Sequence, residues 1–152
     1  KIIVDLERIG DQSVNIAMNV LDLPKGLHFP EKIIPYVERM AEENIRMIRE
    51  VTEAFAGDDE TVICTARDRR KAIKDIRKNA VSNIDVLLGS EKACESDKLK
   101  LFCIVILTLR HLSRVSDHVL NLAERVSFIA TGISPLTLKR AQEKINSATK
   151  DS

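Results

Sequence analysis

The feature that most constrains this fold is a stretch of about 36 residues, from 96 to 131, that contains neither proline nor glycine. Apolar side chains recur in it every three or four positions, which places them on one face of an α-helix. The face consists of Leu101, Val105, Leu112, Val115, Val119, Leu122 and Val126. At 1.5 Å per residue the predicted helix is about 50 Å long, and Gly132 is expected to end it.

The same spacing predicts two helices near the start of the chain. Residues 1–22 form the first, which stops at the sequence DLPKGLHFP, where prolines and a glycine interrupt the pattern. Its apolar stripe consists of Ile2, Leu6, Ile9, Ile16 and Val20. Residues 31–56 form the second, and Gly57 follows as a stop. Its stripe consists of Ile34, Val37, Ala41, Ile45, Ile48, Val51 and Phe55.

Two more helices complete the predicted set. The acidic run 58–60 offers an N-cap and first-turn acids for a helix that extends to Gly89. Its inward residues are Val62, Ala66, Ile73, Ile76, Ala80 and Ile84. Ser134 and Pro135 suit the N-cap and first position of a last helix, which reaches about residue 149.

The overall composition agrees with an all-α protein. Hydrophobic residues make up 44% of the 152 positions and charged residues 31%, with only five glycines and four prolines, which is typical of long amphipathic helices. Since short loops between long helices make antiparallel neighbours, residues 31–132 are predicted to form an antiparallel three-helix bundle. Residues 1–22 and 133–152 are then helices attached to this bundle.

Charge and cysteine usage limit the kind of environment and partner. The formal net charge is +1, so an electrostatic partner must be recognised by a local patch. Cys64, Cys94 and Cys103 form no CxxC pair, which favours a reducing, cytoplasmic location. The longest apolar run, residues 101–109, is far below the roughly 20 residues that cross a bilayer. The chain opens on KIIVDLE in helical rhythm, so we expect further residues to precede it.

An internal repeat appears when the sequence is shifted by 106 positions. DLERIGDQSVNIAMNV, residues 5–20, then aligns with HLSRVSDHVLNLAERV, residues 111–126, with six identities in sixteen positions. Ordinary composition predicts roughly one identity. A shared amphipathic pattern explains the apolar matches but not the polar ones, which are Arg8/Arg114, Asp11/Asp117 and Asn15/Asn121.

This duplicated motif resembles the signature of the PhoU family of phosphate-uptake regulators. The resemblance covers roughly residues 1–132 and rests on LERIGD followed by NIA, and on LSRVSDHVLNLAE. It implies two tandem three-helix bundles, so residues 1–22 are the last helix of a truncated first repeat and residues 31–132 the second. It also implies regulation of a phosphate ABC transporter and of a phosphate-sensing histidine kinase, and in some members metal clusters bound through acidic E/D-x-x-x-D motifs.

The first copy of the motif carries the leading candidate for a metal site. Glu7 and Asp11 are four residues apart, so both carboxylates lie on one helical face, away from the apolar stripe and toward solvent. Asp5 adds a third acid, and Arg8 could neutralise one of them. Oxygen ligands of this kind suit Mg²⁺, Ca²⁺, manganese or iron. A solvated acidic face is the alternative, and the family resemblance favours a divalent metal or iron of unknown identity.

The second copy departs from this pattern. Ser113 stands where Glu7 has its carboxylate, so Asp117 alone remains of the acid pair. His118 is adjacent and His111 replaces Asp5, which allows a mixed site with Asp117 and His118 as ligands. A surface or packing histidine is the simpler interpretation.

A basic run, RDRRKAIKDIRKN at residues 67–79, holds seven basic side chains against Asp68 and Asp75. In the resembling family this helix offers an acidic D-x-x-x-D element, whereas here Ala72 follows Asp68 at that spacing. These basic side chains could bind phosphate, nucleic acid or an acidic partner, or they could form a solvated face. Nucleic acid is the less favoured ligand, because a chain with one Tyr, four Phe and no Trp offers few stacking surfaces.

These patterns favour a non-enzymatic regulator of phosphate uptake and phosphate signalling. It would contact a phosphate ABC transporter or a sensor kinase, and a homodimer is left open. Catalytic signatures such as a Gly-rich phosphate loop or H-E-x-x-H do not occur in the sequence. Two alternatives are a PhoU-like cytoplasmic domain of a sodium/phosphate cotransporter and a nucleic-acid-binding helical bundle.

Overall fold

The computed structural model describes residues 1–57, 59, 61–84, 95–133 and 137. Across these residues the chain forms four α-helices and no strand: α1 (Ile2–Leu21), α2 (Ile34–Gly57), α3 (Val62–Ser82) and α5 (Glu95–Thr131). The predicted all-α class is confirmed. The predicted long helix at 96–131 corresponds to α5 within one residue.

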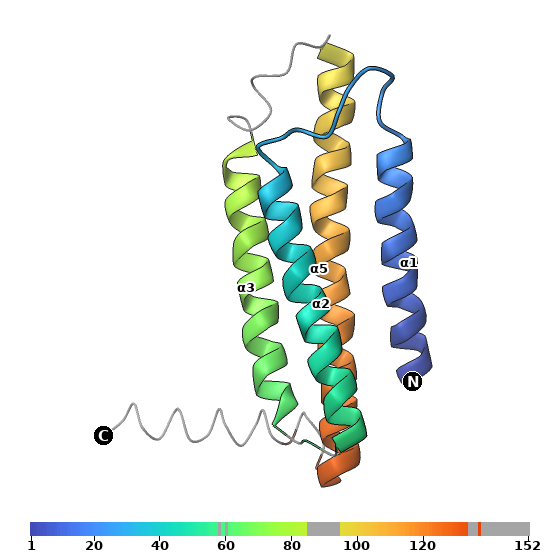
Figure 1. Cartoon of the computed structure of the whole chain (residues 1–152), viewed down its shortest axis with the longest axis vertical. Coiled ribbons are helices and arrows are strands. Elements are labelled where there is room, and N and C mark those ends of the chain that lie inside the picture. The colour runs from blue at the N-terminus through green and yellow to red at the C-terminus, as the bar shows by residue number, and fades with distance from the viewer. Residues whose placement is uncertain (58, 60, 85–94, 134–136, 138–152) are drawn as a thin grey trace, which may run out of the picture.

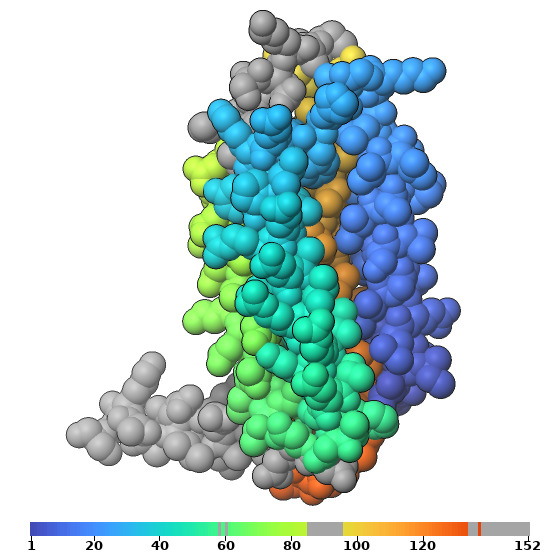
Figure 2. All heavy atoms as spheres, viewed as in Figure 1, coloured from blue at the N-terminus to red at the C-terminus, as the bar shows by residue number. Residues whose placement is uncertain are grey.

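Successive helices alternate in direction, as Figure 1 shows. The helices α2, α3 and α5 pack pairwise against one another as a three-helix bundle, and α1 packs chiefly against α5. In Figure 2 α5 is visible as a strip between α1 and α2. The helix α5 is therefore the central element, because each of the other three helices contacts it.

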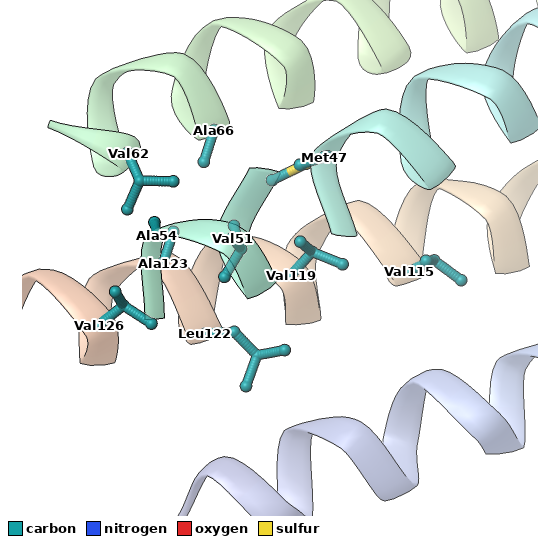
Figure 3. Close-up of a cluster of buried hydrophobic side chains, with 10 residues drawn as sticks. All are labelled: Met47, Val51, Ala54, Val62, Ala66, Val115, Val119, Leu122, Ala123 and Val126. Atoms are coloured by element: carbon teal, nitrogen blue, oxygen red, sulfur yellow. The ribbon is translucent and has the colours of Figure 1, made fainter. Parts of the chain in front are cut away.

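The core lies where α2, α3 and α5 meet, and it divides into two clusters. The first, drawn in Figure 3, consists of Met47, Val51, Ala54, Val62, Ala66, Val115, Val119, Leu122, Ala123 and Val126. The second consists of Ile33, Met40, Ile73, Ile76, Ala80, Ile84, Val105, Leu109 and Leu112. Since burying one large aliphatic side chain contributes about 1.5–3 kcal/mol, these clusters hold the three helices together. Neither cluster has a fully buried member from α1.

The predicted apolar faces of α3 and α5 are confirmed. All seven residues of the predicted α5 face are buried, as are the six predicted inward residues of the preceding helix, of which five lie in α3 and Ile84 follows its end. In both helices the longest regular series of apolar residues is the one that packs inward, so periodicity identifies the buried side.

The predicted stripe of α1 is wrong at Leu6 and Val20, which are more than half exposed. The buried positions of α1 are instead polar: Asp5, Gln12 and Asn19. From the predicted stripe Ile2, Ile9 and Ile16 are partly buried against the two core clusters. The helix α1 thus presents a polar line to α5 and much of its apolar surface to solvent.

The predicted stripe of α2 is also partly wrong, because Ile34, Ile45 and Phe55 are exposed. The buried residues of α2 are Met40, Asn44, Met47, Val51 and Ala54. Apolar side chains of α2 occupy two adjacent faces, and the spacing of three and four fits either. Packing buries the face that carries both core methionines. On this face the Asn44 amide nitrogen donates hydrogen bonds to the backbone carbonyls of Met40 and Leu112 at 2.9 and 3.0 Å.

The helix ends follow local chemistry. Asp59 accepts hydrogen bonds from the Thr61 backbone nitrogen at 2.8 Å and from its hydroxyl at 2.7 Å, which shapes the tight turn before α3. Gly132 adopts φ of 68° and donates to the Phe128 carbonyl at 2.9 Å, so it ends α5 as predicted. The helix α3 ends at Ser82, before the predicted Gly89. Residues 85–94 and, apart from Thr137, the predicted last helix lie outside the described residues.

None of the described helices combines the length and apolarity that a bilayer span requires.

Candidate functional site

The contact between α1 and α5 is built on a buried acid. Asp5 is only 2% exposed, and its carboxylate accepts a hydrogen bond from Arg125 Nε at 2.8 Å and a longer one from Asn121 Nδ2 at 3.3 Å. The ring nitrogen Nδ1 of His118 lies 3.7 Å from the same carboxylate. Three side chains of α5 therefore surround one acid of α1.

The charge state of Asp5 follows from these neighbours. Burial acts to raise the pKa of its carboxyl, but the hydrogen bonds from Arg125 and Asn121 and the positive charge of Arg125 outweigh burial. The pKa of Asp5 is therefore held below its ordinary value. Asp5 is ionised at neutral pH, and the contact is a charge-assisted hydrogen bond.

Two more polar contacts continue this line along α1. Gln12 Oε1 lies 2.7 Å from His111 Nδ1, and Asn19 Nδ2 donates to the Thr108 hydroxyl at 3.2 Å. Asp5, Gln12 and Asn19 are seven residues apart, which is about two helical turns, so they lie on one face. The α1–α5 contact is thus a row of polar pairs flanked by half-buried isoleucines.

These pairs have an unusual relation to the sequence repeat. A shift of 106 positions carries Asp5 onto His111 and Gln12 onto His118. The two residues of the Asp5–His118 contact are therefore the repeat counterparts of the two residues of the Gln12–His111 contact. Antiparallel helices related by a two-fold axis make contacts with this reciprocity.

The predicted metal ligands do not come together in one place. Glu7 and Asp11 are exposed on the side of α1 away from α5. Asp5 and His118 lie side by side, but Arg125 already neutralises that carboxylate. Asp117 faces α3, where it accepts a hydrogen bond from Arg70 Nε at 2.6 Å and lies 3.6 Å from Lys74 Nζ.

Comparison with known proteins identifies the family. The model of the PhoU domain matches residues 37–126, which include most of α2, all of α3 and most of α5. This match covers more than half of the chain. The chain belongs to the PhoU family.

Several PhoU relatives align with nearly the whole chain at low identity. A protein of Pseudomonas aeruginosa named phosphate-specific transport system accessory protein PhoU homolog is 26% identical over 147 residues, which are 95% of this chain and 59% of the relative. A homolog of Thermotoga maritima is 32% identical over 84% of this chain and 53% of its own length. The chain thus spans a little over half the length of these relatives. No solved structure matches it significantly.

The metal prediction for this PhoU-family chain rests on Glu7 and Asp11. Among the described residues, no three His, Cys, Asp or Glu side chains are grouped closely enough to hold a metal ion. Two carboxylates on an exposed helix leave most coordination positions of a hard cation to water or to another surface. Metal binding at Glu7 and Asp11 stays a prediction, and loss of bound metal from a Glu7→Ala, Asp11→Ala variant in elemental analysis tests it.

Sequence reasoning missed most of the α1–α5 contact, including Gln12, Asn19 and Arg125. The predicted apolar stripe of α1 assigns no inward position to a polar residue, so it does not indicate that Gln12 and Asn19 are buried. The spacing 5, 12, 19 was the available signal, because three polar residues seven apart form a line that a helical neighbour can bind.

A second polar cluster joins α2 to α3. Arg69 of α3 donates from Nη1 to Glu43 at 2.7 Å and from Nε to Glu50 at 2.7 Å. These partners raise the pKa of Arg69, chiefly through the hydrogen bond with Glu50. Beside the cluster an open groove of about 520 Å³ is lined by residues such as Arg39, Glu42 and Asp75. Because its lining carries both signs of charge, the groove selects no simple ion.

Proposed function

We propose that this protein is a non-enzymatic accessory regulator of phosphate uptake and phosphate signalling on the cytoplasmic side of the membrane. The observation that carries the proposal is the PhoU-domain match over α2, α3 and α5, together with relatives named as accessory proteins of a phosphate-specific transport system. A rigid helical bundle suits this role, because its long faces can dock on a phosphate transporter or a sensor kinase without chemistry of their own.

A chimera tests this function. The segment of the P. aeruginosa relative that aligns with the chain is replaced by the chain itself, and the chimera is expressed in a strain that lacks the relative. We expect control of phosphate uptake to return. A chimera with an unrelated helical bundle of equal length is the control. If a folded chimera restores no control where the intact relative does, the proposed function is wrong.

We also propose that α1 belongs to a further three-helix unit, as the repeat suggests. Under the shift of 106 positions, exposed residues of α1 correspond to residues of α5 that are buried in the core. The pairs are Ile3/Leu109, Leu6/Leu112, Gly10/Ser116, Ala17/Ala123, Val20/Val126 and Leu21/Ser127. The outward face of α1 therefore matches the surface with which α5 binds α2 and α3.

A polar residue supports the same assignment. Asp117 of α5 pairs with Arg70 of α3, and its counterpart Asp11 is exposed on α1. We expect a basic residue of a neighbouring helix to pair with Asp11, since a charged pair at a helix contact fixes the register of the two helices.

Maleimide labelling tests the arrangement. In a background with all three native cysteines replaced by serine, Val14→Cys should react quickly in the chain alone and slowly in the chimera with the P. aeruginosa relative. Arg8→Cys, on the polar side of α1, should react quickly in both. Equal reactivity of Val14→Cys in the chain and the chimera contradicts the proposed unit.

A further inference from the structure

The basic run of the sequence forms one side of α3. At 100° per residue its members other than Arg69 fall within about a third of the helix circumference. These members are Arg67, Arg70, Lys71, Lys74, Arg77 and Lys78. The helix α5 packs beside this side of α3, as the Arg70–Asp117 pair shows, and it adds the exposed residues Arg110 and Arg114. We call this surface the basic face.

Acids offset the charge of α3 unevenly. On the side toward α2, Arg69 is paired with both Glu43 and Glu50. On the basic face, Asp117 pairs with Arg70 and Lys74, and Glu124 is half-buried on α5 nearby. Lys71 and Lys78 are exposed and, within the described part of the chain, have no ion-pair partner, although the exposed acids Asp68 and Asp75 lie within one turn of them on α3. The net charge of the whole chain is only +1, so this excess of positive charge is local.

Exposed apolar side chains extend the basic face toward the start of α5. Leu99 is 64% exposed and Leu107 is 40% exposed. Together with Cys103 they are spaced by four, and Arg110 and Arg114 continue the same stripe after steps of three and four. One exposed line of α5 is thus apolar in its first half and basic in its second.

We propose that the basic face binds an anionic membrane surface peripherally, with Leu99 and Leu107 contacting the headgroup boundary. Two helices side by side present a broad surface, whereas the major groove of a nucleic-acid duplex admits a single helix. Basic residues together with exposed leucines are the combination that interfacial helices use on anionic lipids. Such docking would hold the protein beside a membrane transporter, but it does not depend on the proposed transporter partner.

Vesicle sedimentation tests the proposal on the full chain. With vesicles of equal parts phosphatidylglycerol and phosphatidylcholine we expect co-sedimentation that weakens as NaCl rises, and none with phosphatidylcholine alone. A Lys71→Gln, Lys78→Gln, Arg110→Gln variant should bind about 100-fold more weakly, since each basic residue near such a surface contributes about fivefold. A Leu99→Gln, Leu107→Gln variant should lose the binding that persists at high salt.

The matched control removes three exposed basic residues from other helices and the α1–α2 loop, in an Arg8→Gln, Lys32→Gln, Arg49→Gln variant. It should bind within about threefold of the unchanged protein, and circular dichroism should show all variants folded. Equal loss in both triple variants, or no sedimentation at low salt, overturns the proposal. Binding to duplex DNA but not to vesicles, lost in the Lys71 triple variant, would assign the basic face to nucleic acid instead.

Discussion

At the scale of single residues, Asp5 carries the attachment of α1. Replacing Asp5 by Asn keeps the shape but removes the charge that Arg125 and Asn121 stabilise. We expect the free energy of unfolding at pH 7 to fall by about 1.5–3 kcal/mol, the range for hydrogen bonds to charged groups. Urea unfolding measures it. Asp11→Asn, on the exposed side of α1, should change stability by less than about 0.5 kcal/mol, and equal effects of the two changes would contradict the role of Asp5.

His111 makes the same contact sensitive to pH. Burial, followed by the charges of Arg114 and Arg110, lowers the pKa of His111 in the folded protein. The unfolded state therefore binds a proton first as the pH falls below about 6.5, so stability is lost from that pH down to the lower folded pKa. We expect His111→Gln, which keeps a polar partner for Gln12, to flatten the fall in stability between pH 7 and 5. Thermal unfolding measures this fall. If the melting temperature of the variant falls with pH as steeply as that of the unchanged protein, His111 does not cause the loss of stability.

At the scale of helices, the sequence predicted some faces well and others poorly for a physical reason. Along α5, the longest regular series of apolar residues is the buried one, so spacing identifies the buried side although Leu99 and Leu107 are apolar and exposed. Along α1, Leu6 and Asp5 are both candidates for the inward side, and only contact with His118 and Arg125 of α5 decides between them. The buried side of α1 thus depends on residues more than 100 positions away in the sequence. The local spacing of apolar residues carries no information about them.

Gly10 illustrates the exposed side of α1. A Cβ added at Gly10 meets no atom within 4 Å, so no described neighbour requires a glycine there. Because glycine inside a helix costs about 0.5–1 kcal/mol relative to alanine, Gly10→Ala should stabilise the isolated chain by about that amount. Thermal unfolding measures the gain, with Ala17→Gly as the opposite control. A loss of stability in the isolated chain would show that the backbone of α1 needs the glycine.

The proposed further unit gives Gly10 a second consequence. Its counterpart Ser116 is completely buried between helices of the bundle. If the further unit packs directly against the backbone at Gly10, closer than the helices pack at Ser116, the added methyl group of Gly10→Ala has no room, and overpacking costs about 1–3 kcal/mol. Gly10→Ala should then stabilise the chain and destabilise the chimera. If the change shifts stability in the same direction in both proteins, this side of α1 is not covered in the chimera.

At the scale of the whole molecule, stability should differ between α1 and the bundle. Both core clusters are built from the bundle and the loop before α2, and α1 adds only partly buried isoleucines and the polar row. The apolar spacing of the sequence indicated the all-α class correctly, because α2, α3 and α5 bury their apolar residues in a shared core. It could not indicate how firmly α1 is held, since that depends on burial of polar groups.

Hydrogen exchange measures this difference directly. Amides of α1 should exchange through an opening of lower free energy than those in the middle of α5, because α1 can separate from α5 while the bundle stays folded. Asp5→Asn should lower protection throughout α1 and leave the opening free energy of α5 near Val105 and Leu109, which lie in the core with α2 and α3, within experimental error. If α1 and α5 instead exchange with one free energy, and Asp5→Asn lowers both equally, the polar row is part of a single cooperative unit. Separate protection would identify α1 as the element that can change its contacts without unfolding the bundle.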